Sequence, residues 1–274
     1  MTPRLSIVIV NFNGGPHLRN CVASLIGHPP AVAHEIVVVD NASNDDSLAS
    51  IRDLPGVRVI TLAHNAGFSA ANNVGFKATT GAVVLLLNND TVVPPGSVDT
   101  LVARLEAHPR AAVAGPRLVD AEARPELSFG RMISPLAELR QKALMLLHAR
   151  GFGPVTRGLD RATRRERYVD WVSGACLLVR RDVAEAVGLL DERFFLYTED
   201  VDFCASVRAQ GWRILFTPAA EIVHLRGRSR ATVPDAMNDA YRRSHLAFYA
   251  KHHPRWTPLL RVYLRARNQL PRGS

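Results

Sequence analysis

The stretch LSIVIVN at residues 5–11 is an unbroken run of apolar and β-branched residues that ends in an asparagine. Runs of this composition form strands that are buried on both faces of a sheet. The pattern returns in EIVVVD, VRVITL and AVVLLLN, at residues 35–40, 57–62 and 82–88. Four such runs at this spacing predict the centre of a largely parallel sheet.

Helices are predicted between these strands. NDDSLASIRDL (44–54) opens with capping residues and acids suited to a helix N-terminus, and GFSAANNVGFKATTG (67–81) is a helical candidate that ends at a glycine. An earlier segment carries an apolar stripe at helical spacing, formed by Leu18, Val22, Leu25 and Ile26. Alternating strands and helices predict βαβ units in an open α/β sheet.

The second half is less regular. We predict a strand over DWVSGACLLVRR (170–181), a helix over EDVDFCASVRAQG (199–211) and an Arg-rich helical tail from about Pro234. A shorter helix over DVAEAVG and a strand over WRILFTP complete this half. Residues 131–168 are basic and loop-rich, with one amphipathic stretch at 135–152.

Composition limits the class of protein. The chain has 274 residues, 47% hydrophobic and 22% charged, which is normal for a folded protein with a sizeable core. Cys21, Cys176 and Cys204 are scattered in apolar or helical contexts, as expected for small buried residues in a reducing compartment. Because no signal peptide and no apolar run of about 18 residues is recognisable, we predict a cytoplasmic protein.

The net charge of +9 is unevenly placed. Residues 131–168 and 224–274 together carry an excess of fifteen positive charges, whereas the remainder carries an excess of six negative ones. A basic rim around an acidic centre fits a polyanionic substrate or the anionic face of a membrane. Nucleic acid is not predicted as a partner, because neither a helix-turn-helix pattern nor clearly interleaved aromatic residues accompany the charge.

Polar residues follow each of the four predicted strands. Ligands of an open α/β sheet bind at the carboxyl ends of its strands, although a single Asn or Asp there also suits a plain turn. Four polar ends in succession predict a binding site. Its candidates are Asn11, Asn13, Asp40, Asn41, Asn65, Gly67 and Asn88 to Asp90.

Common catalytic fingerprints are missing from the sequence. It contains no GxxxxGK[ST], no complete GxGxxG after a strand and no GxSxG. These absences exclude a Walker-type ATPase and argue against a serine hydrolase with a nucleophile elbow.

Six segments occur in the order and spacing of bacterial family-two glycosyltransferases: SIVIVNFNG, VVVDNASNDDS, NAGFSAANNVGF, LLLNND, SGACLLVRR and YTEDVDFCASVRAQGW. The chain resembles the rhamnosyltransferase-like members over about residues 5–225. The resemblance implies a GT-A fold, which is a Rossmann-like open mixed sheet flanked by helices. It divides the chain into a catalytic domain at 1–225, with a nucleotide-binding half (1–120) and an acceptor-binding half (121–225), and a basic helical extension at 226–274.

The same resemblance implies the donor site. Asp40 matches the strand-two aspartate that hydrogen-bonds the pyrimidine, Asn11 lines the same pocket, and Asn88 lies near the ribose or diphosphate. It assigns six further residues to the nucleotide: Asn13, Asn41, Asn65, Gly67, Asn72 and Asn89.

The metal site is implied by NND at 88–90, which stands in the place of the family's DxD motif. Asp90 is the implied ligand of Mg²⁺ or Mn²⁺, and because Asn88 replaces the first aspartate we expect weak metal binding without nucleotide. His224 falls where the family often has a histidine that reaches the metal or diphosphate, although a plain surface histidine fits as well. Three arginines that follow it, from Arg226 to Arg230, offer charge for phosphate.

The catalytic residues are implied by TED at 198–200. Asp200 is the implied general base and Glu199 its positioning partner, while the alternative is a set of acids favoured by the helix dipole. The sugar and acceptor side is assigned to Trp171, Ser173, Gly174 and Ala175.

We therefore predict a metal-dependent inverting glycosyltransferase of cell-surface polysaccharide synthesis. Its expected donor is dTDP-rhamnose, or else a UDP-sugar, and its acceptor is a glycan or a lipid-diphosphate-linked hydroxyl. One alternative is a sugar nucleotidyltransferase, which should have a Gly-rich loop with Lys or Arg after the first strand; the segment NFNGGPHL there contains neither Lys nor Arg. The other alternative is a non-catalytic basic module that binds anionic lipid or nucleic acid. The basic tail is either a solvated face or a peripheral membrane contact.

Overall fold

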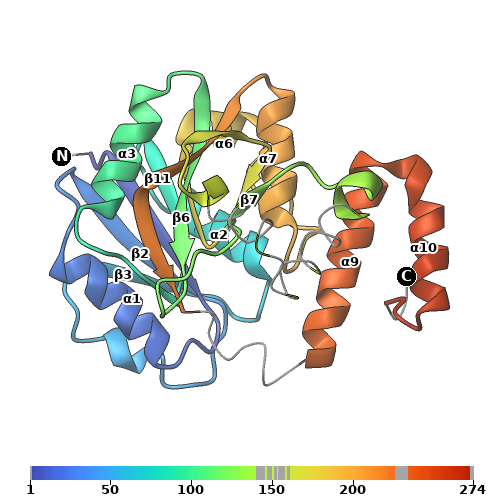
Figure 1. Cartoon of the computed structure of the whole chain (residues 1–274). Helices are drawn as coiled ribbons and strands as arrows, with labels where there is room; N and C mark the ends of the chain where they lie inside the picture. Colours follow the sequence, from blue (N-terminus) through green and yellow to red (C-terminus); the bar gives the residue numbers. More distant parts are fainter. Residues whose placement is uncertain are drawn as a thin grey trace.

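The computed structural model describes residues 2–139, 161–225 and 234–271, with the single positions 146, 150, 153 and 158. In this part of the chain, strands form one mixed sheet that is covered by helices on both faces (Figure 1). The strands are β1 (Leu5–Asn11), β2 (His34–Asp40), β3 (Val57–Thr61), β4 (Val83–Asn88), β5 (Thr91–Val92), β6 (Ala111–Val119), β7 (Phe129–Gly130), β8 (Arg167–Val169), β9 (Trp171–Val172), β10 (Cys176–Arg180) and β11 (Arg213–His224).

The sheet has the order β3-β2-β1-β4-β10-β6-β11-β5, and β8 pairs with β11. Strands β3, β2, β1 and β4 are parallel, as the four apolar runs predicted, with Asn11 of β1 opposite Asp40 of β2. Strand β10 is antiparallel to both of its neighbours, β4 and β6, so it joins the parallel half to the second half. Strands β7 and β9 form a separate two-stranded sheet.

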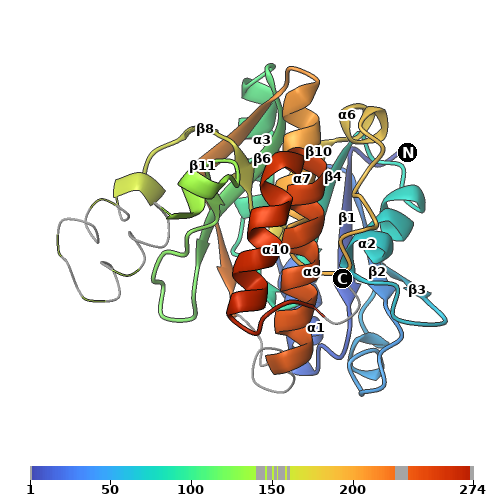
Figure 2. The same ribbon diagram turned by 90° about the vertical axis from the view of Figure 1, so that its right-hand side faces the viewer.

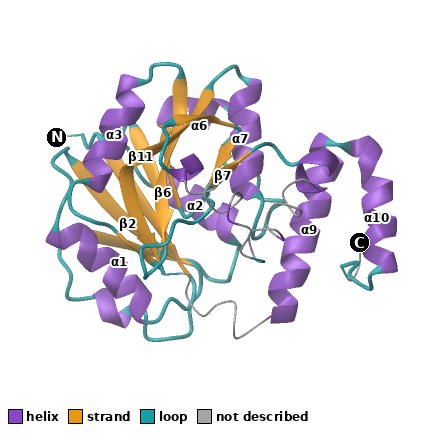
Figure 3. Cartoon of the chain, in the orientation of Figure 1, coloured by secondary structure: helices purple, strands orange, loops and turns teal. Residues whose placement is uncertain are grey.

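Helices follow the strands around the sheet, as Figure 3 shows by secondary structure. The helices are α1 (Pro16–Gly27), η1 (Ala49–Ile51), α2 (Phe68–Lys77), α3 (Ser97–Ala107), α6 (Arg181–Ala186), α7 (Glu199–Ala209), α9 (Pro234–His252), η2 (Pro254–Trp256) and α10 (Thr257–Ala266). Figure 2 shows α9 and α10 running side by side on the outside of the molecule. The predicted helical tail is confirmed, whereas the proposed boundary at 225/226 stays a prediction.

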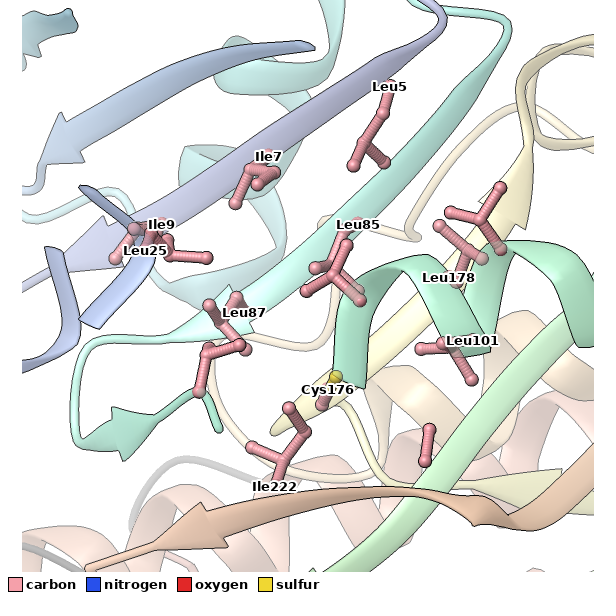
Figure 4. Packing of buried hydrophobic residues seen from close by; sticks show 14 of the residues in the cluster. Leu5, Ile7, Ile9, Leu25, Leu85, Leu87, Leu101, Cys176, Leu178 and Ile222 are labelled. Carbon is pink, nitrogen blue, oxygen red and sulfur yellow. The ribbon is translucent and has the colours of Figure 1, made fainter. Parts of the chain in front are cut away.

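Alternate residues of β1 supply the two halves of the core. Ile7 and Ile9 pack into one cluster with α1 and α3 (Figure 4), and Val8 and Val10 pack into a second cluster with α2 and α7. Side chains of a strand alternate between the two faces of its sheet, so an unbroken apolar run buries both. The sheet is thereby held rigidly, with its polar strand ends at one edge.

The helix predicted over 44–54 is wrong, because the structure has only the short 3₁₀ turn η1 there. Polar side chains of this segment bond to nearby groups instead: Ser47 N–H donates to Asp45 Oδ1 at 3.2 Å, and Gly15 N–H donates to Asp45 Oδ2 at 2.8 Å. Such local bonds compete with helix formation. The segment therefore folds as a loop against the end of β1.

Three other boundaries differ from the prediction. The strand over 170–181 is two strands, β9 and β10, that flank a turn at 173–175, and α2 ends at Lys77, where Thr79 Oγ1 donates to Phe76 O at 2.8 Å. Strand β11 continues beyond the predicted WRILFTP and ends at His224, so that this side chain reaches the polar edge of the sheet.

Strand β6 was not predicted. Its sequence AAVAGPRLV contains glycine and proline, which argue against a strand in the middle of a sheet. Pro116 is accommodated because it pairs with Thr217 of β11 at a point where the register shifts. On the other side of β6, β10 reaches only Val113 and Ala114 and does not pair with Pro116.

No helix among the described residues is both long and apolar enough to cross a membrane. Most of the amphipathic stretch predicted at 135–152 lies outside the described residues, as do Arg226, Arg228 and Arg230.

Candidate active site

A cavity of about 390 Å³ lies at the carboxyl ends of the parallel strands. It is the position that an open α/β sheet offers to a ligand. Six residues from the predicted polar strand ends line it: Asn41, Asn65, Gly67, Asn88, Asn89 and Asp90. Ser173 and His224 line it as well, so β4, the 173–175 turn and the end of β11 meet there.

Asn11 organises the strand ends beneath this cavity. It is fully buried, and its Nδ2 donates to Asp40 Oδ1 at 2.9 Å and to Ser47 Oγ at 2.8 Å. Its Oδ1 accepts a hydrogen bond from Asn89 Nδ2 at 2.8 Å. Gly14 packs so closely that an added Cβ would lie 2.4 Å from Asn11 Oδ1. Asn11 and Asp40 therefore form a fixed support, with neither among the residues that line the cavity.

A second set of amide contacts shapes the neighbouring wall. Asn41 Nδ2 donates to Asn65 Oδ1 at 2.8 Å, and Asn41 Oδ1 accepts from the Ala66 N–H at 2.8 Å. Gly67 adopts a φ of 89° and meets Phe195, since an added Cβ would lie 2.7 Å from the ring of that residue. The β3–α2 loop and the segment before α7 therefore close on each other at the cavity.

The acidic end of the cavity centres on His224. Its Nε2 lies 3.3 Å from Asp90 Oδ1, and its Nδ1 lies 3.1 Å from Glu126 Oε2. Burial lowers the pKa of His224, but the two carboxylates outweigh burial and raise this pKa to about 9. The imidazole is thus held as a cation between two anions.

Asn88 adds an unusual oxygen to this end. Its Oδ1 is buried and has no hydrogen-bond partner among the described residues, although buried amide oxygens are normally paired. Its backbone N–H donates to Ala175 O at 3.0 Å. An unsatisfied buried acceptor that lines a cavity is suited to a ligand that brings a donor or a cation.

Asp90 and His224 are the residues best placed to hold a metal ion. Adjacent ligands of an octahedral ion bound at about 2.1 Å lie about 3 Å apart, close to the separation of these two atoms. Glu126 contacts the opposite ring nitrogen and does not converge with them. Correspondingly, no group of three or more His, Cys, Asp or Glu residues within the described ranges has metal-binding geometry.

Glu199 and Asp200 begin α7 and differ in their hydrogen bonds. Asp200 Oδ2 accepts from the Gly174 N–H at 2.9 Å, and Asp200 Oδ1 accepts from the Val201 N–H at 2.8 Å. Burial raises the pKa of Asp200, and these N–H groups oppose the rise. Glu199 Oε2 is buried without a partner in the described chain, and burial together with the Asp200 charge raises the pKa of Glu199 well above its usual range. The hydrogen bonds therefore favour the ionised form of Asp200 over that of Glu199.

The backbone before this pair is strained. Tyr197 has a φ of 70° and Thr198 a φ of 72°, a region that residues with a Cβ rarely adopt. Each such residue costs about 1–3 kcal/mol and usually persists at functional sites. This turn places Tyr197 in the cavity wall and directs Glu199 into the core.

Some predicted residues lie away from the cavity. Asn72 is 1% exposed, donates to Phe68 O at 2.9 Å within α2 and faces a separate small cavity beside Phe76. Trp171 is not among the cavity-lining residues, and its Nε1 donates to Arg131 O at 2.8 Å. Asn13 is exposed and bonds to the 43–44 turn.

Sequence reasoning missed several residues that build the site. Glu126 follows no predicted strand, so nothing in the sequence places it beside His224. Phe195, Leu196 and Tyr197 line the cavity from the loop before α7, which the motif TED identifies only from residue 198 onward. Ser47, by contrast, lies within the quoted VVVDNASNDDS and was misread as part of a helix.

Comparisons with known proteins agree with this geometry. A sequence profile described as "Glycosyltransferase like family 2" matches residues 3–257. The N-acetylglucosaminyl-diphospho-decaprenol L-rhamnosyltransferase of Mycobacterium tuberculosis is 31% identical, in an alignment of 300 residues that covers 100% of this chain and 96% of the relative.

Two solved structures have a similar fold. The mannosyltransferase PcManGT of Pyrobaculum calidifontis, in complex with GDP-Man and Mn²⁺, has a TM-score of 0.62 and 16% identity, over 95% of this chain and 68% of that one. GalNAc-T7, with UDP, GalNAc and Mn²⁺, has a TM-score of 0.62 and 19% identity, over 89% of this chain and 48% of that one.

The fold resemblance predicted from the six motifs is confirmed, since the structural neighbours are GT-A glycosyltransferases. The comparisons leave no support for a sugar nucleotidyltransferase or for a module without catalytic activity. The profile match and the full-length relative both include the strand ends and the acidic turn described above. The chain belongs to glycosyltransferase family 2, and it is a glycosyltransferase.

Proposed function

We propose that the protein transfers a deoxyhexose from a nucleoside diphosphate-sugar to a hydroxyl of a lipid-diphosphate-linked glycan, with inversion at the anomeric carbon. One observation carries the proposal: the cavity that holds Asn88 and the Asp90–His224 pair is joined by the 173–175 turn to Asp200. Donor-binding groups and a carboxylate base are thus parts of one rigid unit. This arrangement supports direct displacement by an acceptor hydroxyl.

In the proposed reaction Asp200 accepts the proton of the acceptor hydroxyl. The acceptor oxygen forms a bond to the anomeric carbon from the face opposite the nucleoside diphosphate, and the bond from that carbon to the diphosphate oxygen breaks. The proton remains on Asp200 and the electron pair leaves with the diphosphate. Two N–H donors favour the ionised form of Asp200 beside Glu199, which supports this assignment.

A divalent cation, Mg²⁺ or Mn²⁺, would be held by Asp90, with His224 as a second ligand after loss of its proton. When bound, it neutralises charge on the leaving diphosphate. Both donors line the cavity, and their separation suits adjacent ligands of one ion. Because protons compete for His224, metal affinity should rise with pH.

The proposed donor is dTDP-rhamnose, with UDP-sugars next, and the support is the full-length relative named as an L-rhamnosyltransferase. That relative is also named for a diphospho-decaprenol substrate, and this supports a lipid-linked acceptor here. The proposed role is therefore in the assembly of a cell-surface polysaccharide. The wall formed by Asn41 and Asn65, whose amides are hydrogen-bonded to each other, lines the cavity that would receive the nucleotide.

The first experiment measures the thermal unfolding temperature with dTDP, UDP or GDP, each with and without Mn²⁺. A ligand at about 100 times its dissociation constant stabilises the folded state by about 2.7 kcal/mol. We expect a manganese-dependent shift that is largest with dTDP. Asp90→Asn should remove the manganese dependence, and a shift in that variant that still grows with manganese contradicts the metal assignment.

Asp200→Asn tests the base separately. This variant should keep the nucleotide shift and lose at least about 100-fold in kcat, because general-base catalysis contributes about 10²–10⁴-fold. Asp182→Asn, which alters an exposed acid of α6, is the matched control and should transfer sugar at the wild-type rate. Equal loss of nucleotide binding and transfer in Asp200→Asn contradicts the assignment.

A further inference from the structure

Helix α10 carries apolar side chains on two separate faces. Leu260 and Leu264, one turn apart, form the inner face: Leu264 is 4% exposed, and Leu260 packs against the cluster that contains Phe248 of α9. Figure 1 shows α9 lying between α10 and the sheet. The inner face accounts for the attachment of α10 to the protein.

The outer face has no such role. Leu259, Val262 and Tyr263 recur at a spacing of three and four residues, and they are 60%, 65% and 45% exposed. Trp256, just before the helix, is 49% exposed. Large apolar side chains gathered on one exposed face mark an interaction surface, whereas scattered ones do not. We call these four residues the outer face of α10.

Cations border the outer face. At about 100° per residue, Arg261 and Arg265 fall beyond Val262 on one side, and Arg267 falls beside Tyr263 on the other. The Arg267 guanidinium lies 5.7 Å from the centre of the Tyr263 ring. Residues 254–271 contain four arginines and no acidic residue.

We propose that the outer face of α10 is a docking surface for an anionic phospholipid membrane. A helix that lies in a membrane interface presents leucine, valine and aromatic side chains to the acyl boundary and arginines to the headgroups, which is the pattern found here. The inference goes beyond the proposed function, because it rests on α10 alone and requires no particular donor or acceptor.

A second copy of the chain is a poorer occupant of this face. In a symmetric dimer the same patch meets itself, so the arginines of two copies that each carry a net charge of +9 would be brought together. Nucleic acid would complement the arginines but would leave Leu259 and Val262 unburied. An anionic membrane satisfies both the charge and the apolar side chains.

The test is co-sedimentation of the full chain with phosphatidylcholine vesicles, with and without phosphatidylglycerol. The wild type should bind the phosphatidylglycerol vesicles, and added salt should weaken this binding. Leu259→Ser/Val262→Ser/Tyr263→Ser should lower the partition coefficient roughly tenfold or more by removing apolar area. Arg261→Gln/Arg265→Gln should lower it by roughly fivefold per arginine.

Two matched controls alter exposed residues elsewhere. Val59→Ser changes a valine of β3 that is 43% exposed, and Arg52→Gln/Arg110→Gln removes two exposed arginines far from α10 in sequence. Both should bind vesicles like the wild type. Because the changed side chains are exposed, all variants should unfold at close to the wild-type temperature.

Three results would overturn the proposal. The first is that the wild type binds neither kind of vesicle, and the second is that the triple serine variant binds vesicles as well as the wild type does. The third is that the wild type is a dimer that binds no vesicles, while the triple serine variant is a monomer. Nucleotide-induced thermal shifts measured on the same samples separate this proposal from the proposed function. If the nucleotide-induced thermal shift is absent but the protein binds vesicles, only the proposed function is contradicted. If the thermal shift is present but the protein binds no vesicles, only the docking surface is contradicted.

Discussion

At the scale of single residues, the site depends on which polar atoms have partners and which do not. The side chain of Asn11 is hydrogen-bonded to Asp40, Ser43, Ser47 and Asn89. In contrast, Asn88 Oδ1 and Glu199 Oε2 are buried with no partner in the described chain. A buried polar atom without a partner costs about 1–3 kcal/mol. Asn88 Oδ1 lies at the cavity and Glu199 Oε2 lies beside Asp200, the proposed base, where we expect a ligand and a proton, respectively, to compensate this cost.

Glu199→Gln should stabilise the protein increasingly as pH rises. Glu199 keeps its proton in the folded state because burial raises its pKa, while in the unfolded state it titrates at about 4.3. The contribution of Glu199 to the free energy of unfolding is therefore fully present below about pH 4.3, and it is lost as pH rises toward the folded-state pKa. The gap in unfolding temperature between variant and wild type should be near zero at about pH 4 and should widen toward neutrality.

Glu185→Gln, on the exposed surface of α6, is the control for this measurement and should show a gap that does not depend on pH in this way. A gap for Glu199→Gln that stays constant from acid to neutral pH would show that Glu199 is ionised in the folded protein.

His224 makes a prediction in a different window. Its pKa is raised to about 9 in the folded protein, against about 6.5 when unfolded, so its contribution is complete below about pH 6.5 and is lost as pH rises through about 9. The wild type should exceed His224→Gln in unfolding temperature at about pH 6, and the difference should shrink toward pH 9. The measurement is made with a chelator present, and a difference that grows with pH contradicts the ion-pair interpretation.

At the scale of elements, α7 is fixed at both sides of its first turn. The Asp200 carboxylate is held by the 173–175 turn, and Asp202, 1% exposed, is held by α9 through Lys251 Nζ at 2.8 Å and His252 Nε2 at 2.6 Å. A helix whose first turn is bonded to two different elements has little freedom to move Asp200, the proposed base. We expect the contact between α7 and α9 to be required for the geometry of transfer.

Lys251→Met should lower the free energy of unfolding by about 1–3 kcal/mol, because a buried carboxylate loses a charged partner. It should also lower kcat more than it changes nucleotide affinity, since Asp202 shares a helical turn with Asp200. Arg255→Met, an exposed change in η2, should stay within about 0.5 kcal/mol of the wild type. An unchanged unfolding temperature for Lys251→Met, or equal losses in kcat and nucleotide affinity, would contradict the proposed role of the contact between Lys251 and Asp202.

At the scale of the whole molecule, the C-terminal helices are part of the folded unit. Phe248 and Tyr249 of α9 are 0% and 3% exposed and pack against Phe194 and Val201, which flank the turn at 195–200. An element that shares buried side chains with the rest of a protein unfolds with it.

Urea unfolding should therefore be a single transition. Far-UV circular dichroism, to which α9 and α10 contribute, should change over the same urea range as the fluorescence of the partly buried Trp171 and Trp212, recorded in a Trp256→Phe variant because Trp256 belongs to the C-terminal segment. Loss of helix signal at clearly lower urea than the fluorescence change would show that residues 234–271 unfold as a separate unit.

The sequence by itself determined the parallel half of the sheet, because β1, β2 and β4 are apolar runs that are buried on both faces. The prediction of burial on both faces is wrong for β3, which lies at the edge of the sheet and is largely exposed. It also located Asn88 to Asp90 at a strand end and Asp200 at a helix start, since both follow strong local signals. Local patterns failed at 44–54 and at β6, where side-chain bonds to distant strands and a proline at a register shift decide the backbone. The pairing of His224 with Asp90 and Glu126, and of Asp202 with α9, joins residues about 50 to 134 positions apart in the chain. Only the tertiary structure decided these contacts, because a sequence pattern records periodicity along the chain and not which side chains the folded sheet brings together.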